Sequence, residues 1–375
     1  MKIGVLKEKE PEKRVALLPE AVKALLELKA EVLVERSAGS GAFVSDAEYE
    51  KAGAQLVNRN QLYKESDLIV TINPPEVNEL KSVDSSKILI GALNPFHNKA
   101  LIDQLQSSKL TSFSLELVPR ITRAQSMDIL SSMATVAGYK AVLDAAYQLP
   151  RFFPMFMSAA GTIKPARMLI LGAGVAGLQA LAIARKLGAI VEVFDVRSAV
   201  KEEVLSLGGK FVEVAGAVED ASAGGYAIEQ SEDFKKRQAE LIQTHARNAD
   251  VILCTAQIPG KKAPVLVTKE TVAAMKPGSL IIDLAASTGG NCELTEFNKV
   301  VEVHGVKIIG NSNYTNQMAV DASAMFGRNV VNLLKLFISE QGALKLDFSD
   351  EIIKGACLTH EGELMNERVK LSYKN

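Results

Sequence analysis

The amino-acid sequence predicts an α/β fold made of two Rossmann-like, doubly wound parallel-sheet domains joined by long helices. Short apolar runs of strand length alternate with segments of helical periodicity along most of the chain. A glycine-rich turn at residues 172–177 lies so far along the chain that another domain must precede it. The 375 residues, of which 47% are hydrophobic, suffice for two buried cores.

The first part of the chain shows the rhythm of βαβ units. Strands are expected at Ile3–Leu6, Glu31–Val34 and Asp67–Val70, and helices are expected at Leu18–Leu28 and Ala47–Gly53. Strands that alternate with helices usually pair in parallel, because each helix carries the chain back across the sheet. A first parallel-sheet domain is therefore predicted ahead of the glycine-rich turn.

The surroundings of the glycine-rich turn are those of a dinucleotide-binding site. Met168–Leu171 has the short, apolar, branched composition of a buried strand, and Val175–Leu187 has helical spacing that stops at Gly188. Ile190–Phe194 supplies a second strand, and Asp195 follows it. Strand, turn, helix, second strand and acid in this order indicate cofactor binding, with a purely structural glycine turn as the alternative.

Each residue of the motif has an expected chemical task. Gly172 allows the tight turn, Gly174 lets the backbone approach a pyrophosphate, and Gly177 lets helix and strand pack closely. The free N–H groups at the start of the helix attract the anion. Asp195 lies where a ribose hydroxyl is held, and its charge repels a 2′-phosphate, which favours NAD(H) over NADP(H). Arg197 leaves open the alternative of a phosphate receiver.

Beyond Asp195 the alternation continues through further strand patterns, at Phe211–Val214, Val251–Cys254, Leu280–Asp283 and Lys307–Ile309. Long helical patterns at about Met127–Gln148 and about Ala319–Glu340 flank this region, so the second helix is expected to return the chain to the first domain. The predicted domains are a discontinuous first domain, 1–126 plus 320–375, and an NAD-binding domain, 127–319.

Two segments each allow two interpretations. Val330–Phe337 is apolar enough to be buried between the domains as a connecting helix, with a surface helix as the alternative. Ala215–Ala239 combines glycines, charges and Tyr226, which predicts either a mobile loop that folds over a cofactor or a solvated connection.

Composition excludes several classes of function. The formal net charge of −1, the pI near 6.5 and the scarcity of aromatic residues argue against nucleic-acid binding. Cys254, Cys292 and Cys357 are widely spaced in apolar or glycine-rich sequence, as reduced core thiols in a reducing compartment are. No histidine has a partner at ligand spacing, so no metal is predicted. Met1–Leu6 lacks the features of a signal peptide, and no apolar run is long enough to span a bilayer.

Several motifs carry a family resemblance. The polar run Arg120–Ser132, together with Pro165–Gln179 and Leu207–Lys210, resembles the NAD(H)-binding component (domain I) of proton-translocating nicotinamide nucleotide transhydrogenase. The similarity spans nearly the whole chain, with further matches at Gly224–Ala227, Gln257–Gly260, Ala263–Leu266 and Gly289–Cys292. The family's domain I has two Rossmann-like halves and forms a homodimer, and both properties are expected here.

The resemblance implies Re/Si-specific hydride transfer from NADH on this chain to NADP⁺ on a separate domain III. The transfer would be coupled to proton passage through a membrane-spanning domain II. The chain would then be active only within a complex, as a cytoplasmic protein held peripherally on the inner face of the membrane by its partner subunits.

The resemblance also assigns residues. Four residues would line the nicotinamide end and act in catalysis: Arg120, Gln125, Asp128 and Ser131. Gln125 would reach toward the partner's nucleotide, while Asp128 and Ser131 would orient the ring. Others would surround the rest of NAD, beside the three motif glycines: Val175, Ala176, Asp195, Val196, Arg197, Gly225, Tyr226, Gln238 and Gln257. The alternatives are that Asp128 and Ser131 only cap a helix and that Gln125 is an exposed amide.

Alanine dehydrogenase has a similar two-domain architecture and is the main alternative. Oxidation of an amino acid needs a base and a cation for the carboxylate, whereas transfer between nicotinamides moves no proton at the reacting atoms. The substrate lysine of that enzyme family is missing around Val70–Pro75, its catalytic histidine is missing around Ile88–Leu93, and Ser287 replaces its aspartate, although Arg14 is retained. His97 is interpreted as a turn or cap residue. A non-catalytic NAD-sensing module is the third hypothesis.

Overall fold

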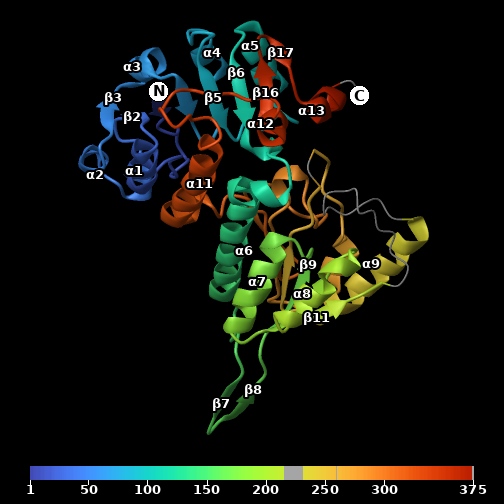
Figure 1. The fold of residues 1–375 in the computed structure, drawn as a ribbon. Helices are drawn as coiled ribbons and strands as arrows, with labels where there is room; N and C mark the ends of the chain where they lie inside the picture. Colours follow the sequence, from blue (N-terminus) through green and yellow to red (C-terminus); the bar gives the residue numbers. More distant parts are fainter. Residues whose placement is uncertain (215–230, 259, 374–375) are drawn as a thin grey trace. The chain divides into compact units, whose positions relative to one another are not determined.

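The computed structural model describes residues 1–214, 231–258 and 260–373. The chain divides into two compact units, one formed by Met1–Met133 with Asn316–Asn375 and the other by Ala134–Thr315 (Figure 1). Each unit contains one mainly parallel sheet, so the predicted α/β class with two Rossmann-like sheets is confirmed. The assignment of functional domains to particular boundaries stays a prediction.

The sheet of the first unit has the strand order β17-β16-β6-β5-β4-β1-β2-β3. The pairs from β3 to β6 are all parallel, whereas β16 and β17 add antiparallel strands at one edge. The strands are β1 Lys2–Val5, β2 Glu31–Glu35, β3 Gln55–Val57, β4 Leu68–Val70, β5 Ile88–Gly91, β6 Thr111–Ser114, β16 Cys357–His360 and β17 Glu363–Leu364. Strands from both ends of the chain therefore share this sheet.

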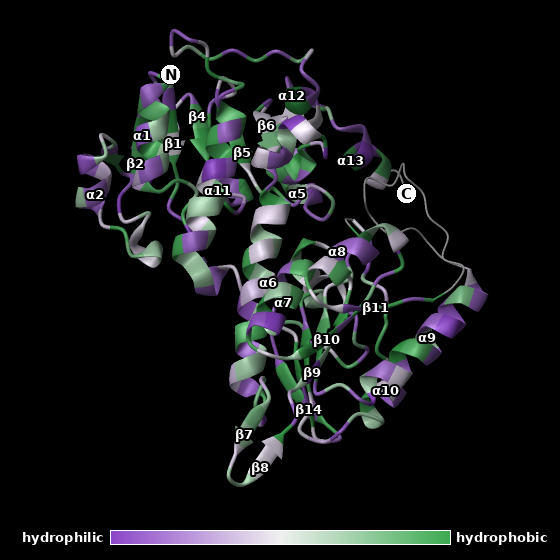
Figure 2. Cartoon of the chain, turned by 60° about the horizontal axis from the view of Figure 1, so that its bottom comes forward, coloured by the Kyte–Doolittle hydropathy of each residue, from purple (hydrophilic) through white to green (hydrophobic). Residues whose placement is uncertain are grey.

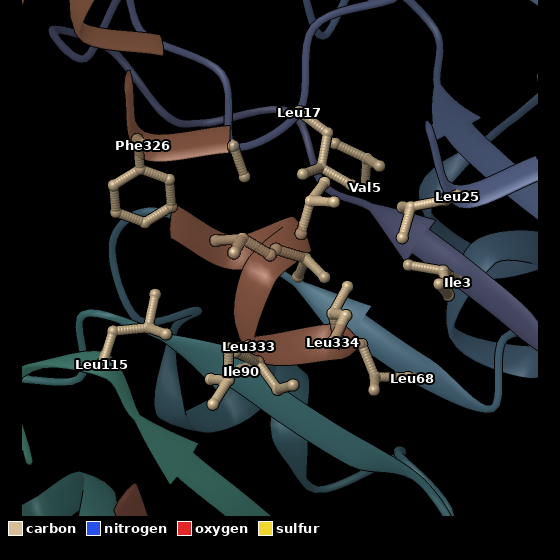
Figure 3. Packing of buried hydrophobic residues seen from close by; sticks show 14 of the residues in the cluster. Ile3, Val5, Leu17, Leu25, Leu68, Ile90, Leu115, Phe326, Leu333 and Leu334 are labelled. Carbon is tan, nitrogen blue, oxygen red and sulfur yellow. The ribbon is translucent and has the colours of Figure 1, made fainter. Parts of the chain in front are cut away.

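Side chains of the first unit's strands alternate between two cores. Ile3 of β1, Leu68 of β4 and Ile90 of β5 pack on the side of helices α1 Pro19–Glu27 and α11 Ala319–Leu334. Figure 3 shows this packing. Ile69 and Leu89 belong to the opposite core, which includes residues of α3 Arg59–Glu65, α5 Lys99–Ser107 and α13 Glu367–Ser372. The remaining helices are α2 Asp46–Lys51, α4 Val77–Leu80 and α12 Glu351–Ala356.

The sheet of the second unit has the order β11-β10-β9-β12-β13-β15-β14, and only the pair β14–β15 is antiparallel among its described strands. Its strands are β9 Arg167–Leu171, β10 Ile190–Phe194, β11 Lys210–Val212, β12 Val251–Cys254, β13 Leu280–Asp283, β14 Val300–Val303 and β15 Val306–Ile309. Its helices are α6 Ile129–Gln148, which begins in the first unit, α7 Val175–Lys186, α8 Lys201–Ser206, α9 Glu232–Ala246 and α10 Lys269–Ala273. Figure 2 colours β9 and β10 as hydrophobic and much of α9 as hydrophilic.

The second unit also has two cores, one on each face of its sheet. Met168 and Ile170 pack with residues of α6 and α7, whereas Leu169 and Leu171 pack with residues of α9 and α10. Gly138 of α6 lies so close to α7 that a Cβ atom would come within 2.2 Å of the Ala176 carbonyl oxygen. The start of α7 is thereby held between α6 and the sheet.

A two-stranded hairpin, β7 Phe156–Ser158 and β8 Gly161–Ile163, pairs with no other described strand. It extends away from the sheet of the second unit in Figure 1. Several large apolar side chains in and beside it are exposed: Phe152, Met155, Phe156, Met157 and Ile163. This hairpin was not predicted.

Three sequence-based expectations are wrong in detail. Residues 232–239 of the expected loop form the first turns of α9, in which Phe234, Gln238 and Ile242 face inward at helical spacing. Helix α11 ends at Leu334 rather than near Glu340. Val330, Leu333, Leu334 and Phe337 lie within the core of the first unit, which the connecting-helix interpretation did not anticipate. The rest of the expected loop, 215–230, lies outside the described residues.

No described helix is both long and apolar enough to cross a membrane.

Cys254, Cys292 and Cys357 are buried free thiols, as expected of core cysteines. Burial raises the pKa of the Cys292 thiol to about 11 and that of the Cys357 thiol to about 12, so both are neutral and unreactive near neutral pH.

Candidate nucleotide-binding site

The strand order of the second unit reverses direction at β9. Leu171, at the end of β9, pairs with Phe194 of β10 on one side and with Cys254 of β12 on the other. Open parallel sheets bind ligands outside the carboxyl ends of the strands at such a switch point. The segments that follow these three strands therefore meet at one edge, and they contain the glycine-rich turn, Asp195 and Gln257.

The glycines of the turn differ in what surrounds them. Gly172 has a φ of +108°, and a Cβ atom there would lie 2.6 Å from Thr255 Oγ1. At Gly177 a Cβ atom would lie 1.9 Å from the Gly172 carbonyl oxygen, so only glycine lets α7 approach the strand end. At Gly174 a Cβ atom would meet no described atom within 4 Å. Gly172 and Gly177 serve the fold of the turn, whereas Gly174 leaves the outer surface of the turn open.

The open surface at Gly174 coincides with the start of helix α7. Gly174 is the N-cap residue, and its carbonyl accepts the first helical hydrogen bond from Leu178 N at 2.9 Å. The N–H groups of Val175, Ala176 and Gly177 belong to the first turn and have no acceptor within the helix. Val175 is 42% exposed. This arrangement fits a pyrophosphate, because the helix dipole and the N–H groups favour a negative charge.

Asp195 follows β10 and supports the turn from the side. Its Oδ2 accepts a hydrogen bond from Ala173 N at 2.7 Å. Arg197 donates to the same carboxylate through its backbone N at 2.9 Å, Nε at 2.9 Å and a terminal nitrogen at 2.8 Å. Asp195, which the sequence predicts to be the ribose acceptor, also braces the glycine-rich turn through these bonds, and this structural role was not predicted.

The segment after β12 lies against the glycine-rich turn. Thr255 Oγ1 donates to the carbonyl oxygens of Leu171 at 3.2 Å and Gly172 at 2.9 Å. Gln257 is exposed, and its Nε2 donates to the Leu284 carbonyl at 3.0 Å, which fixes the side chain across the ends of β12 and β13. The turn and Gln257 are therefore brought to the same edge of the sheet.

The other predicted nucleotide contacts are distributed unevenly. Val196 is half-buried beside Asp195, and Gln238 is buried on the inner face of α9. Gly225 and Tyr226 lie outside the described residues. In the part of the chain that the structure describes, no group of three or more His, Cys, Asp or Glu residues could hold a metal ion.

The predicted nicotinamide-end residues all lie in the first unit. Arg120 is exposed, and Gln125 is an exposed residue of the 3-10 helix Thr122–Met127. Asp128 accepts from Ser131 N at 3.0 Å and from Ser131 Oγ at 2.6 Å, so this pair does form the cap at the start of α6. The cap accounts for Asp128 and Ser131 without a ligand, and it also fixes their positions.

Residues far along the chain hold this run in place, and sequence reasoning missed them. Asn329 and Asn332 of α11 both donate through Nδ2 to the Ser126 carbonyl, at 2.8 and 3.2 Å. Arg123 forms a two-pronged ion pair with Asp350, at 2.7 and 2.8 Å. In each of these contacts the two partners are more than 200 residues apart in the sequence, so no local sequence pattern indicates them.

The positions that matter for amino-acid oxidation are occupied differently. Asn73 donates to the carboxylates of Glu8 and Glu12, and Glu12 accepts from Arg14 Nε at 2.8 Å and from its terminal nitrogen at 2.7 Å. Burial opposes the ionisation of Glu12, but the bonds and charge of Arg14 hold its pKa below the usual value. His97 is exposed and directly precedes Asn98, the N-cap of α5, as the turn interpretation expected.

Comparison with known proteins decides the family. Residues 4–137 match the family model described as Alanine dehydrogenase/PNT, N-terminal domain, and residues 141–367 match Alanine dehydrogenase/PNT, C-terminal domain. The chain is 45% identical over 376 aligned positions to an NAD(P) transhydrogenase subunit alpha protein of Rhodospirillum rubrum, covering 98% of each protein. The chain belongs to the NAD(P) transhydrogenase alpha-subunit family. The predicted resemblance is therefore confirmed.

Solved structures of this family and its neighbour agree with that result. The crystal structure of a transhydrogenase from Sinorhizobium meliloti superposes with a TM-score of 0.89 at 43% identity, over 97% of this chain and 100% of that one. An L-alanine dehydrogenase superposes with a TM-score of 0.81 at 26% identity, over 100% and 99%. The alanine dehydrogenase architecture is thus shared, but the sequence is closer to the transhydrogenases. Family membership implies that a nicotinamide nucleotide is the ligand.

Proposed function

We propose that this chain is the NAD(H)-binding component of a proton-translocating NAD(P) transhydrogenase. It holds NADH for direct hydride transfer to NADP⁺ on a partner domain. The observation that carries the proposal is the open glycine-rich turn, where the first N–H groups of α7 and the Asp195 carboxylate flank the same edge of the sheet. The family membership and the 45% identity to a transhydrogenase alpha subunit support it.

Each part of the second unit has a task in holding the nucleotide. The N–H groups of Val175, Ala176 and Gly177 receive the pyrophosphate, and Asp195 accepts from the ribose hydroxyls. Arg197 gives direct charge compensation to Asp195, because their contact is 2.8 Å. An arginine engaged in this way favours NAD(H) over a nucleotide with a 2′-phosphate. Val196, Gln238 and Gln257, with Gly225 and Tyr226, complete the contacts.

The family resemblance assigns the reacting end of the cofactor to residues before and at the start of α6. Arg120, Gln125, Asp128 and Ser131 face the nicotinamide, with Gln125 directed toward the nucleotide of the partner. Asp128 and Ser131 suit this task because their mutual bonds of 2.6 and 3.0 Å fix one polar surface at the start of α6. The chemistry needs orientation rather than a base, since hydride passes between two rings with no proton to remove.

The partners follow from the same proposal. NADP(H) lies on domain III, a membrane-spanning domain II carries the protons, and the chain is held on the inner, cytoplasmic face of the membrane by these subunits. The Rhodospirillum rubrum relative is named as belonging to a subunit alpha, and such a name suits an assembly of several chains.

The chain itself acts as a homodimer in this proposal. The hairpin β7–β8 pairs with no other described strand and supports a self-association surface, because Met157 within it is 75% exposed and Met155 directly before it is 57% exposed. Light scattering of the purified chain tests this directly: a monomer at micromolar concentration contradicts it, and Met157→Glu should weaken the dimer if the hairpin contributes.

Two alternatives remain distinct. Alanine dehydrogenase shares the fold, but Val70–Pro75 contains no lysine, Ile88–Leu93 contains no histidine, and Ser287 stands in place of the aspartate. A non-catalytic NAD sensor would bind NADH and transfer nothing.

One mixing experiment separates the three hypotheses. The purified chain should bind NADH without turnover, and addition of an NADP(H)-binding domain III should start transfer. NADH that carries deuterium on its reacting carbon should deliver the label to NADPH without loss to water. Reduction of NAD⁺ by L-alanine would identify a dehydrogenase instead, and NADH binding without either reaction would favour the sensor.

A further inference from the structure

The described part of the second unit contains a buried side-chain amide that is bonded to both ends of a segment next to the candidate nucleotide site. Asn291 is 0% exposed. Its Oδ1 accepts from Ala256 N at 3.0 Å, and its Nδ2 donates to the carbonyl oxygens of Ala256 at 2.9 Å and Pro264 at 2.8 Å. All the bonding groups of one amide plane except one lone pair are thus spent on a single segment of backbone.

The segment between Ala256 and Pro264 carries Gln257. Ala256 is the residue directly before Gln257, and it is bonded to Asn291 through both its N–H and its carbonyl group. A backbone unit held at both polar groups has little freedom to rotate. The direction in which Gln257 leaves the chain is therefore set by the Asn291 amide.

Asn291 is itself fixed from behind by a buried carboxylate. Asp283, at the end of β13, accepts from Asn291 N at 2.8 Å, Cys292 N at 3.0 Å and Thr295 Oγ1 at 2.7 Å through Oδ2, and from Ala285 N at 3.0 Å through Oδ1. Gly290, with a φ of +79°, brings the backbone so close that a Cβ atom would lie 2.9 Å from Asp283 Oδ2. Together these contacts connect the end of β13 to the segment after β12.

We infer that Asn291 is a positioning residue of the nucleotide site. Its side-chain hydrogen bonds to the backbone of Ala256 and Pro264 orient Gln257. The inference rests on the proposed function, because Gln257 is a nucleotide contact only if NAD(H) binds at this edge. Asn291 need not touch the nucleotide to act in this way. Its effect on NADH binding is transmitted through Gln257.

The substitution that tests this role is Asn291→Asp. Aspartate has the same shape and keeps the oxygen that accepts from Ala256 N, but its ionised form cannot donate to the carbonyl oxygens of Ala256 and Pro264. The folded variant should bind NADH roughly tenfold more weakly near pH 8. Asn248→Asp is the matched control, because Asn248 is exposed in the same unit and its described side-chain bond runs to the carbonyl oxygen of Thr244 in the preceding helix α9. Its NADH affinity should be unchanged.

The pH profile of the variant distinguishes positioning from general damage. A new carboxyl group that is buried beside Asp283 has a raised pKa, and its protonated form can donate to one carbonyl. NADH affinity of Asn291→Asp should therefore recover as the pH is lowered from about pH 8 to about pH 6, where the unmodified chain changes little. A constant loss over this range would overturn the inference.

A double-mutant cycle tests the route through Gln257. If Asn291 acts through that side chain, Gln257→Ala combined with Asn291→Asp should bind NADH about as weakly as Gln257→Ala alone. Additive losses would show that Asn291 contributes elsewhere. If the unmodified chain fails to bind NADH at all, the proposed function fails first, and the two failures are distinguishable.

The unmodified chain offers a test that needs no variant to fold. The backbone N–H of Ala256 should exchange slowly with deuterated water, because it is bonded to the buried Asn291 oxygen. Rapid exchange at this one amide would show that the hydrogen bond to Asn291 is absent in solution, and it would overturn the inference directly.

Discussion

Arg197 donates to both carboxylate oxygens of Asp195, through Nε to Oδ1 at 2.9 Å and through a terminal nitrogen to Oδ2 at 2.8 Å. The Asp195 side chain is nearly buried, at 6% exposure, whereas that of Arg197 is 24% exposed. The carboxylate is held beside the glycine-rich turn by a cation of the same loop. In the proposed site, nucleotide choice is expected to depend on this pair of residues rather than on the acid alone.

Removal of the acid should change both affinity and selectivity. Asp195→Ala is expected to weaken NADH binding by roughly 1.5–3 kcal/mol, since a hydrogen bond to a charged group is lost. The same change releases the Arg197 guanidinium, so the preference for NADH over NADPH should narrow. Fluorescence titration with both nucleotides measures this, with Asp233→Ala as a control at an exposed acid on α9. An unaltered preference would mean that Arg197 does not face the ribose.

The glycines of the turn provide a matched pair of substitutions. At Gly177 a Cβ atom would lie 1.9 Å from a backbone oxygen, so Gly177→Ala should lower the melting temperature. At Gly174 a Cβ atom has no described neighbour within 4 Å. The free energy of unfolding of Gly174→Ala should therefore lie within about 0.5 kcal/mol of that of the unmodified chain. It should nevertheless bind NADH at least tenfold more weakly, because the methyl group occupies the space of the pyrophosphate. Undiminished binding by a well-folded Gly174→Ala would place the nucleotide elsewhere.

The role proposed for Gln125 separates binding from transfer. Gln125 is exposed and its amide takes no part in the cap of α6, so Gln125→Asn should leave folding and NADH affinity nearly unchanged. The rate of hydride transfer to NADP⁺ should fall by at least tenfold, because the side chain becomes too short to position the partner's nucleotide. Single-turnover kinetics with domain III measures the rate. Equal losses in affinity and rate would contradict this role.

Glu8 should make the first unit's stability depend on pH. Burial raises the pKa of Glu8, although its bonds from Ile72 N and Asn73 N oppose the shift. The folded chain then holds the Glu8 proton more tightly than the unfolded chain. The contribution of Glu8 to stability is therefore fully present below the ordinary pKa of about 4.5 and is lost as the pH rises through the raised value.

The free energy of unfolding, measured by urea titration at several pH values between about pH 4 and about pH 7, tests this dependence. Glu8→Gln removes the titrating group and should flatten the slope, even though the amide satisfies fewer of the donors. The same slope in both proteins would assign the pH dependence to another residue.

The parts of the fold that were predictable have a local periodic signal. β9, β10, β12 and β13 are mostly apolar runs, although Glu192 interrupts β10, and they were expected within a residue or two of their bounds. The turn geometry at Gly172 and Gly177 also agrees with the roles expected from their spacing. Buried parallel strands are the easiest elements to find, because both of their faces are apolar.

The missed elements depend on partners far along the chain. β6, Thr111–Ser114, was not predicted, yet its Ser112 is buried and shares a 2.7 Å bond with Thr359 of β16. The start of α9 had an N-cap signal at Ser231, followed by two acids, but the surrounding charges concealed it. Of the candidate site, the identities of the glycines and Asp195 could be predicted, whereas the supports from Arg197, Asn291 and Asn329 required the tertiary structure.

The first unit is completed by Asn316–Asn375, which supplies α11 to its core and β16 to its sheet. During synthesis on the ribosome, Ile3, Leu68 and Ile90 are made early. Their core is complete only after Leu333 and Leu334 have been synthesised. The second unit, continuous from Ala134 to Thr315, has no such delay. The middle of the chain can therefore complete its core earlier in synthesis than the first unit can.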